Sequence, residues 1–192
     1  MDVLILIVGK SGSGKDTIVK YLCNKYNYTQ LKSYTTRNKR SETEDTHIFI
    51  TEEEFNKLDN IVAYTEFNNY RYCATQEQCD NSDFYIIDPD GVDYFKEKYN
   101  GNKTPIIIYM DVPFVKRFKR MLERGDSIKS AIKRILYDRE KFNNINFNPD
   151  YIIMNNNFGS TCLKLMKIIG ENSNGLNSTG LKLLDKIEKG KK

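Results

Sequence analysis

Short apolar runs alternate with amphipathic stretches along most of the chain. Residues 3–8 are apolar at every position, which is typical of a strand covered on both faces. In residues 15–25 the apolar side chains recur every three to four positions, which predicts a helix with one buried face. Further strands are predicted at 83–88, 104–111 and 151–154, and further helices at 91–99, 114–123, 127–142 and 161–169. This order predicts an α/β fold with a parallel sheet flanked by helices.

The middle of the chain, residues 33–75, departs from this alternation. Thr51 and Glu54 have the spacing of a capping box that begins a short helix. Residues 61–67 and 70–75 read as the two strands of a hairpin, because the Asn-Asn pair between them tolerates positive φ. The simplest interpretation is a small strand-rich insertion in a βαβ core.

The last residues differ in composition from the rest of the chain. Residues 171–180 are polar and rich in Asn, Ser and Gly, which is typical of a flexible linker. Residues 181–189 could form a short amphipathic helix, but their basic end favours a solvated tail over a partner site. We therefore predict a core of residues 1–32 and 76–170, an insertion of residues 33–75 and a flexible tail of residues 171–192.

Composition narrows the class of protein. With 192 residues, 39% of them hydrophobic, the chain can bury a core without disulfides. Its longest strongly apolar run is too short to cross a membrane, and the acidic Asp2 does not resemble the basic start of a signal peptide, so we expect a cytoplasmic protein without a membrane partner. One histidine and four cysteines without a C-x-x-C pair disfavour zinc. A net charge of +4 is too small to indicate a nucleic-acid partner, whereas small anionic ligands stay open.

A glycine-rich segment links the first predicted strand to the first predicted helix. Its spacing, Gly-x-x-x-x-Gly-Lys, is that of a phosphate-binding loop in the expected strand–loop–helix context. The glycines let successive backbone N–H groups point at phosphate oxygens, and the helix N-terminus adds its positive end. Lys15 supplies a mobile charge for β- and γ-phosphates. The predicted phosphate-binding residues are Gly9, Ser11, Gly12, Ser13, Gly14 and Lys15.

The residues after Lys15 differ from the usual loop, where Ser or Thr follows the lysine and holds magnesium. Here Asp16 comes first and Thr17 second. Asp16 is a hard oxygen ligand that suits Mg²⁺. Thr17 is the alternative, by resemblance to adenylate-kinase-type loops. The sequence leaves both ligands open.

Residues 33–40, Ser-Tyr-Thr-Thr-Arg-Asn-Lys-Arg, place two arginines three positions apart. Guanidinium groups bind phosphate in a two-pronged manner, so this pair suits a second phosphate-bearing ligand. Together with the phosphate loop, the segment resembles guanylate kinases, whose pattern is Ser-x-Thr-Thr-Arg-x-x-Arg. The likeness continues in order at residues 49–55, 67–75, 87–92, 120–125, 134 and 150–155. It spans roughly residues 3–170.

The resemblance implies a binding site for an acceptor nucleotide. Arg37 and Arg40 would hold its monophosphate, with help from the hydroxyl of Tyr72, and Ser33 and Asp88 would face its base. His47 falls where the family usually has a tyrosine that touches the same phosphate. An imidazole can donate a hydrogen bond there too, and an anionic phosphate favours its protonated form.

Two positions that read guanine in the family differ in this chain. The glutamate that accepts the N1–H and amino group of guanine aligns with Ala63, and a hydroxyl residue aligns with Ala74, although Thr75 could supply a hydroxyl. Glu66 cannot replace the missing carboxylate, because residues three apart in a strand point to opposite faces. Kinase identity is therefore better supported than guanine specificity.

Residues 116–141 are rich in Lys and Arg, a pattern whose default interpretation is a solvated helical face. Gly125-Asp126-Ser127 interrupts the run and predicts a helix–loop–helix lid around residues 120–134. By resemblance, the lid arginines would stabilise charge on the transferring phosphoryl group and exclude water. These arginines are Arg120, Arg124 and Arg134. Asn155 would approach the adenine of ATP.

The resemblance thus implies an ATP- and Mg²⁺-dependent kinase that converts GMP or dGMP to the diphosphate. The residues expected to take part in transfer are Lys15, Arg37, Arg120, Arg124 and Arg134. One alternative is the same transfer to a different nucleoside monophosphate. An alternative of another class is a guanylate-kinase-like scaffold that binds peptides, which is disfavoured because Lys15 and the arginines are retained. The oligomeric state cannot be inferred from the sequence.

Overall fold

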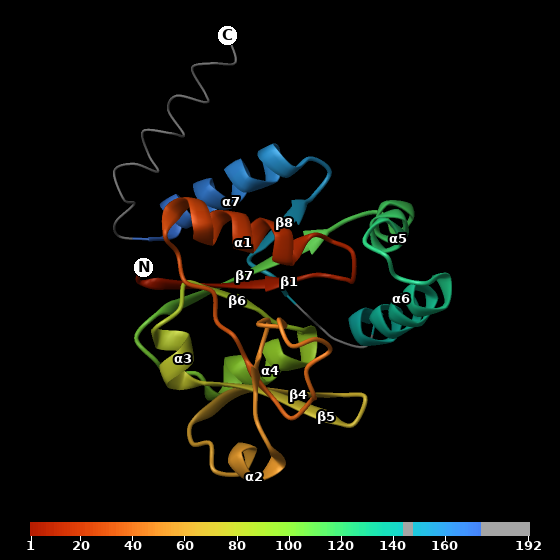
Figure 1. Ribbon diagram of the computed structural model, residues 1–192. Coiled ribbons are helices and arrows are strands. Elements are labelled where there is room, and N and C mark those ends of the chain that lie inside the picture. Colours follow the sequence, from red (N-terminus) through yellow and green to blue (C-terminus); the bar gives the residue numbers. More distant parts are fainter. Residues whose placement is uncertain (144–147, 174–192) are drawn as a thin grey trace.

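The protein is built around a four-stranded parallel sheet (Figure 1). The structure, a computed structural model, describes residues 1–143 and 148–173. The sheet has the strand order β6-β1-β7-β8. Its strands are β1 (Val3–Val8), β6 (Phe84–Ile86), β7 (Thr104–Asp111) and β8 (Tyr151–Met154). Because all four are parallel, the loops after their carboxyl ends meet at one edge, where open α/β sheets bind ligands.

Both faces of the sheet are covered, which explains the uninterrupted apolar run of β1. Its odd-numbered residues pack against α1 (Lys15–Tyr26) and α7 (Phe158–Asn172). Its even-numbered residues pack against α4 (Pro89–Lys98) on the other face. Figure 1 shows this layering, with α1 and α7 on one side of the sheet and α4 on the other. The predicted α/β fold is therefore confirmed.

The predicted bounds of several elements need adjustment. β6 is shorter than predicted, because Asp88 leaves the strand and caps α4 by accepting a hydrogen bond from the N–H of Gly91 at 2.7 Å. α7 begins earlier and extends to Asn172, so the predicted linker cannot begin at residue 171. The remainder of the predicted tail, residues 174–192, lies outside the described residues. β1, β7, β8 and α5 (Phe114–Glu123) have the predicted bounds.

The insertion forms a second sheet with the order β3-β2-β5-β4. Its strands are β2 (Tyr34–Thr35), β3 (Ile48–Phe49), β4 (Ile61–Phe67) and β5 (Tyr70–Thr75). The β4–β5 hairpin is confirmed, with Asn68 and Asn69 at φ of 51° and 62°. The predicted capping box of Thr51 and Glu54 is also present at the start of α2 (Glu52–Phe55). A further short helix, α3 (Gln76–Asp80), connects the hairpin to β6.

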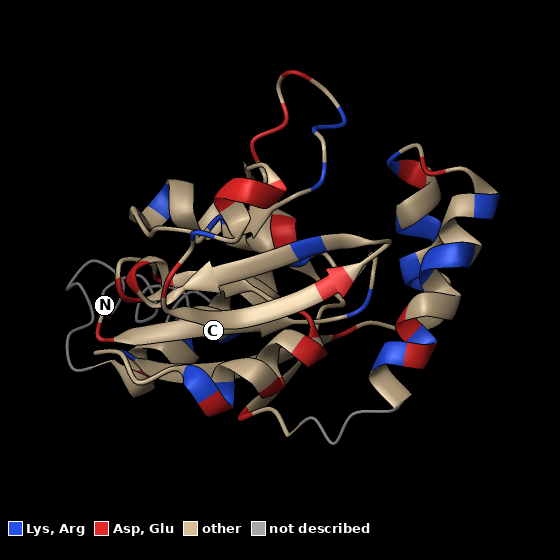
Figure 2. Cartoon of the chain, turned by 90° about the horizontal axis from the view of Figure 1, so that it is seen from below, with Lys and Arg blue, Asp and Glu red and all other residues tan. Residues whose placement is uncertain are grey.

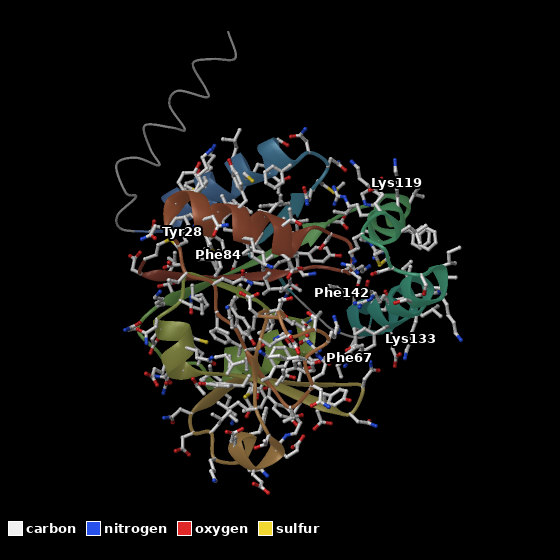
Figure 3. All side chains as sticks on the ribbon, viewed as in Figure 1. Tyr28, Phe67, Phe84, Lys119, Lys133 and Phe142 are labelled. Atoms are coloured by element: carbon white, nitrogen blue, oxygen red, sulfur yellow. The ribbon has the colours of Figure 1, made fainter. Side chains whose placement is uncertain are left out.

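A pair of helices, α5 and α6 (Ile128–Asn143), lies beside the carboxyl edge of the sheet. Gly125, with φ of 95°, forms the turn between them. Lys and Arg are frequent along both helices (Figure 2). α6 also contacts the insertion, since the ring centroids of Tyr137 and Phe67 are 4.6 Å apart. Figure 3 shows Phe67 at the end of the hairpin nearest α6. No helix among the described residues is long and apolar enough to span a lipid bilayer.

Candidate active site

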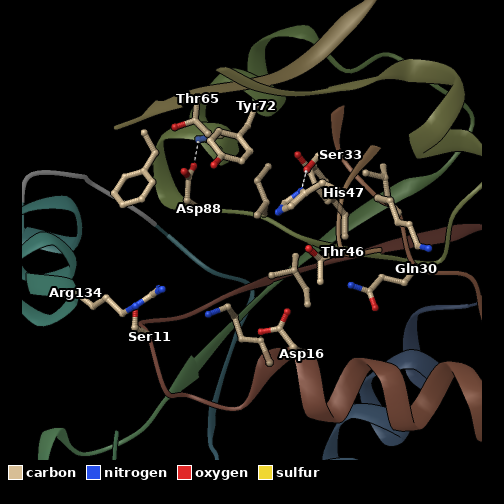
Figure 4. A pocket seen from close by; sticks show the side chains of 18 of the residues that line it. Ser11, Asp16, Gln30, Ser33, Thr46, His47, Thr65, Tyr72, Asp88 and Arg134 are labelled. Carbon is tan, nitrogen blue, oxygen red and sulfur yellow. Dashed lines mark hydrogen bonds between the residues drawn. The ribbon is translucent and has the colours of Figure 1, made fainter. Parts of the chain in front are cut away.

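A cavity of about 970 Å³ lies where the core, the insertion and α6 meet (Figure 4). Its volume falls at the upper end of the range for small-molecule sites, roughly 300–1,000 Å³. Each of these three parts of the fold contributes polar side chains to its wall. The predicted site residues that line it are Ser11, Lys15, Asp16, Ser33, Arg40, His47, Tyr72, Asp88 and Arg134.

The phosphate loop forms one end of this pocket. Gly12 and Gly14 have φ of 76° and 86°, a conformation that favours glycine, and a Cβ on Gly12 would lie 2.6 Å from the carbonyl oxygen of Arg117. The ammonium group of Lys15 folds back over the loop and donates to the Gly9 carbonyl at 2.5 Å. Burial lowers the pKa of Lys15, while the nearby carboxylate of Asp16 raises it. The loop thus holds the Lys15 ammonium group against its own carbonyl oxygens at this end of the pocket.

Two of the predicted ligand-binding residues instead support the loop from behind. Arg120 donates to the carbonyl oxygens of Gly12 and Ser13 at 3.4 and 3.3 Å. Asn155 is buried, donates from Nδ2 to the Ser13 carbonyl at 2.7 Å and accepts at Oδ1 from the hydroxyl of Thr161 at 3.0 Å. These contacts occupy the amide group of Asn155, and Asn155 does not line the pocket. The structure therefore does not place it where the sequence predicted a contact with the adenine of ATP.

A buried acidic residue of α6, Asp138, contacts the phosphate loop directly. Its carboxylate accepts hydrogen bonds from the N–H and hydroxyl of Ser11, at 2.8 and 3.2 Å. Arg117 of α5 donates to the same carboxylate and to the Ser11 carbonyl, both at 3.3 Å. Neither residue was predicted, because both lie in the run interpreted as a basic face. The available signal was the spacing of Asp138 four residues after Arg134, which places the two on one side of a helix.

The lid arginines differ in where they point. Arg134 lines the pocket, and its buried Nε lies 3.7 Å from the Asp126 carboxylate, an ion pair that lacks the geometry of a hydrogen bond. Arg124 lies outside the pocket wall and donates two hydrogen bonds, of 3.2 and 2.6 Å, to the carboxylate of Asp126 in the turn. The structure therefore brings one lid arginine, Arg134, to the cavity, while Arg124 stabilises the turn that joins α5 to α6.

Of the two arginines of the insertion, Arg37 and Arg40, only Arg40 lines the pocket. Arg37 is buried beside it and donates to both carboxylate oxygens of Glu44, at 3.2 and 2.7 Å. These bonds from Arg37, together with the N–H of Arg40, lower the pKa of Glu44 to about 2. The guanidinium of Arg37 also lies over the ring of Phe49. Arg37 thus acts on the pocket through an ion pair that the sequence pattern did not predict.

His47 lies between this pair and the base end of the pocket. Its Nδ1 is 2.9 Å from the hydroxyl of Ser33, and its ring meets the edge of the Tyr72 ring. Burial lowers the pKa of His47 below its ordinary value of 6.5, and the positive charge of Arg37 lowers it further. Both effects favour the neutral imidazole of His47 in the protein without ligand.

We expect an anion at Arg40 to reverse this shift. Binding of GMP adds negative phosphate charge near His47, so the pKa of the imidazole should rise, whereas guanosine, which lacks phosphate, should leave it unchanged. The chain has one histidine, so imidazole NMR during a pH titration reports on His47 without ambiguity. A pKa that responds equally to GMP and guanosine would contradict the placement of phosphate beside His47.

The base end of the pocket contains fewer of the predicted groups. Asp88 lines it, but Thr75 does not, because the Thr75 hydroxyl caps α3 through the N–H of Gln78. Ala63 and Ala74 pair across the hairpin and are fully buried. Glu66 is exposed and accepts a hydrogen bond from Tyr64, which confirms that it points away from the face of Ala63.

The two candidate magnesium ligands also differ in position. Asp16 lines the pocket next to Lys15, whereas Thr17 is exposed and absent from the pocket wall. Within residues 1–143 and 148–173, no group of three or more His, Cys, Asp or Glu side chains gathers as a metal site. A metal ion at this loop would therefore rely on one carboxylate together with ligand phosphates, the usual arrangement for Mg²⁺.

Comparison with known proteins gives a consistent result. A sequence model of the guanylate kinase family matches residues 1–172. A guanylate kinase of Malacoplasma penetrans is 28% identical over 186 residues, which cover 88% of this chain and 92% of that protein. One of Clostridium acetobutylicum is 27% identical over 176 residues, covering 87% and 84%. The fold is similar to the crystal structure of guanylate kinase from Anaplasma phagocytophilum, with a TM-score of 0.58 at 21% identity, covering 90% and 87% of the two chains.

Proposed function

The chain belongs to the guanylate kinase family, and on this basis we propose that it transfers the γ-phosphoryl group of ATP to GMP, giving ADP and GDP. One observation carries the proposal: a single pocket joins the phosphate loop and Lys15 to a second set of basic and polar groups, Arg40, His47 and Asp88. Such a pocket can hold two nucleotides with their phosphates facing each other. Positioning and charge stabilisation then carry most of the chemistry.

The roles of individual residues follow from their places in the pocket. The loop N–H groups and Lys15 bind the β- and γ-phosphates of ATP. Arg40 binds the GMP phosphate, and Arg37 supports that site from behind. Arg134 reaches the pocket from α6 with its positive charge, which suits it to bind the phosphoryl group in transfer. α6 covers this region and limits the access of water that would hydrolyse ATP.

Mg²⁺ is the expected companion of ATP, and Asp16 is the residue best suited to hold it. Its carboxylate is a hard oxygen donor that lines the pocket next to Lys15. Bound there, the ion would neutralise charge on the β- and γ-phosphates.

Replacing Asp16 by Asn should raise the magnesium concentration needed for half-maximal activity by roughly tenfold, because one charged ligand is lost. Thr17→Val is the matched control and should leave that concentration unchanged, since Thr17 does not line the pocket. Titration of magnesium at saturating ATP and GMP measures both. The opposite pattern would make Thr17 the ligand.

A coupled assay of ADP formation tests the function itself. With ATP fixed, the acceptors are GMP, dGMP, AMP, CMP, UMP and dTMP. We expect turnover with GMP and dGMP and little with the others. If no monophosphate supports turnover, the enzyme proposal fails and a peptide-binding scaffold becomes the better account. A preference for another base would overturn only the identity of the acceptor.

A further inference from the structure

The base end of the pocket lacks the carboxylate expected from the family pattern, since Ala63 stands at that position of β4. Ala63 is fully buried and its methyl side chain offers no hydrogen-bond acceptor. A pocket for guanine must still offer acceptors to two adjacent donors of the base, its N1–H and its 2-amino group. A polar side chain on the same face of β4 could supply one of these acceptors.

Thr65 is that side chain. β4 pairs regularly with β5 from Ala63 to Phe67, so its side chains alternate, and Thr65 points to the same side as Ala63. Thr65 and Phe67 line the pocket; the ring of Tyr64, from the other side of the strand, also reaches its wall, and the Tyr64 hydroxyl donates to the exposed Glu66. The alternation that removes Glu66 from the base site thus places a hydroxyl within it.

The hydroxyl of Thr65 is buried and makes no hydrogen bond of regular geometry within the protein. It lies next to the carboxyl group of Asp88 on the pocket wall, without the geometry of a regular hydrogen bond to it (Figure 4). A buried hydroxyl without a regular partner is destabilising, and a ligand that supplies the partner recovers that free energy on binding.

Asp88 supplies the second acceptor. Its carboxyl caps α4 by accepting from the N–H of Gly91 at 2.7 Å, which fixes its orientation at the pocket wall. Burial raises the pKa of Asp88, while the Gly91 N–H and the neighbouring Thr65 hydroxyl lower it. The two groups come from different elements, β4 and the N-terminus of α4, yet lie on one side of the pocket.

We propose that Thr65 is a specificity-determining residue for the acceptor base. Its oxygen accepts an N–H of the 2-amino group of guanine while its own hydrogen points to Asp88, and the Asp88 carboxylate accepts the N1–H. This pair replaces the single glutamate of the family pattern. The inference rests on the proposed function, because it takes GMP as the acceptor. It favours guanine, whose two donors are adjacent, over hypoxanthine, which keeps N1–H and lacks the 2-amino group.

Thr65→Val tests the proposal, because valine keeps the shape of threonine and removes the hydroxyl. The KM for GMP should rise about tenfold, the effect of one lost hydrogen bond, with kcat unchanged within about twofold. The KM for inosine 5′-monophosphate should change much less, because Asp88 still accepts its N1–H. Thr65→Ser should restore the wild-type KM for GMP. Thr104→Val, at the exposed start of β7, is the control for a threonine outside the pocket.

Two results would overturn the role of Thr65. One is an equal rise of KM for both acceptors, and the other is a Thr65→Ser variant no better than Thr65→Val, since either would indicate packing alone. If the wild-type protein turns over no monophosphate, the proposed function fails separately. Calorimetric titration without ATP then tests the role of Thr65, by comparing the affinities of wild type and Thr65→Val for GMP and for inosine 5′-monophosphate. Absence of GMP binding to the wild-type protein overturns both proposals.

Discussion

Lys15→Met should lower kcat by about 10²–10³-fold, the usual effect of removing one group that stabilises charge in a transition state. The ammonium group lies within the phosphate loop, bonded to the carbonyl of Gly9, and lines the pocket. Methionine keeps most of the side-chain length and removes the charge. Steady-state kinetics with saturating ATP and GMP measures the loss.

The effect should be specific to this lysine. Lys25 lies on the same helix, is bonded to the hydroxyl of Tyr21 and does not line the pocket, so Lys25→Met is the matched control and should keep wild-type kcat. Circular dichroism and thermal unfolding of both variants test whether the fold is intact. A Lys15→Met variant with more than a tenth of wild-type kcat would contradict the role given to this residue.

Arg37→Ala should raise the KM for GMP on the order of 10²-fold, while the KM for ATP changes by less than about threefold. The guanidinium is buried and bonded to both carboxylate oxygens of Glu44. Removal of the Arg37 guanidinium leaves the Glu44 carboxylate without its ion-pair partner, next to Arg40. The carboxylate then repels the GMP phosphate and competes with it for the positive charge of Arg40. The variant therefore loses an attractive group and gains a repulsive one.

Two further variants separate these causes. The double variant Arg37→Ala with Glu44→Ala should recover part of the lost GMP affinity, because it also removes the unpaired carboxylate. Arg71→Ala is the matched arginine control, since Arg71 lies over the ring of Phe55, pairs with Glu52 and does not line the pocket. It should lower stability and keep the KM for GMP. Equal increases of both KM values in Arg37→Ala would place Arg37 outside the acceptor site.

Local sequence signals predicted the elements that depend on local physics. The continuous apolar run predicted β1 because both of its faces are buried, and the Asn68-Asn69 pair predicted the hairpin because both residues adopt positive φ. The same kind of signal accounts for the position of Thr75. Thr75 and Gln78 have capping-box spacing, and this local interaction removes the Thr75 hydroxyl from the pocket.

Contacts between distant segments could not be predicted in this way. Asn155 and Asp138 bond to the phosphate loop only because the fold brings the end of β8 and one side of α6 next to it. Each of the two residues lies more than a hundred positions after the loop in the sequence. Thr65 is an intermediate case. The strand alternation that excluded Glu66 applies equally to Thr65, but the importance of Thr65 depends on Asp88 lying next to it, which the fold alone provides.

The bonds between Asp138 and Ser11 have a consequence for how the two ends of the pocket influence each other. Any movement of α6 away from the core must break two hydrogen bonds to the phosphate loop, and ligand phosphates or water must then replace them. A position of α6 without these bonds would therefore differ from the observed one in its affinity for ATP. By reciprocity, ATP changes the balance between those positions by the same factor, so that nucleotide binding and closure over GMP form one thermodynamically coupled equilibrium.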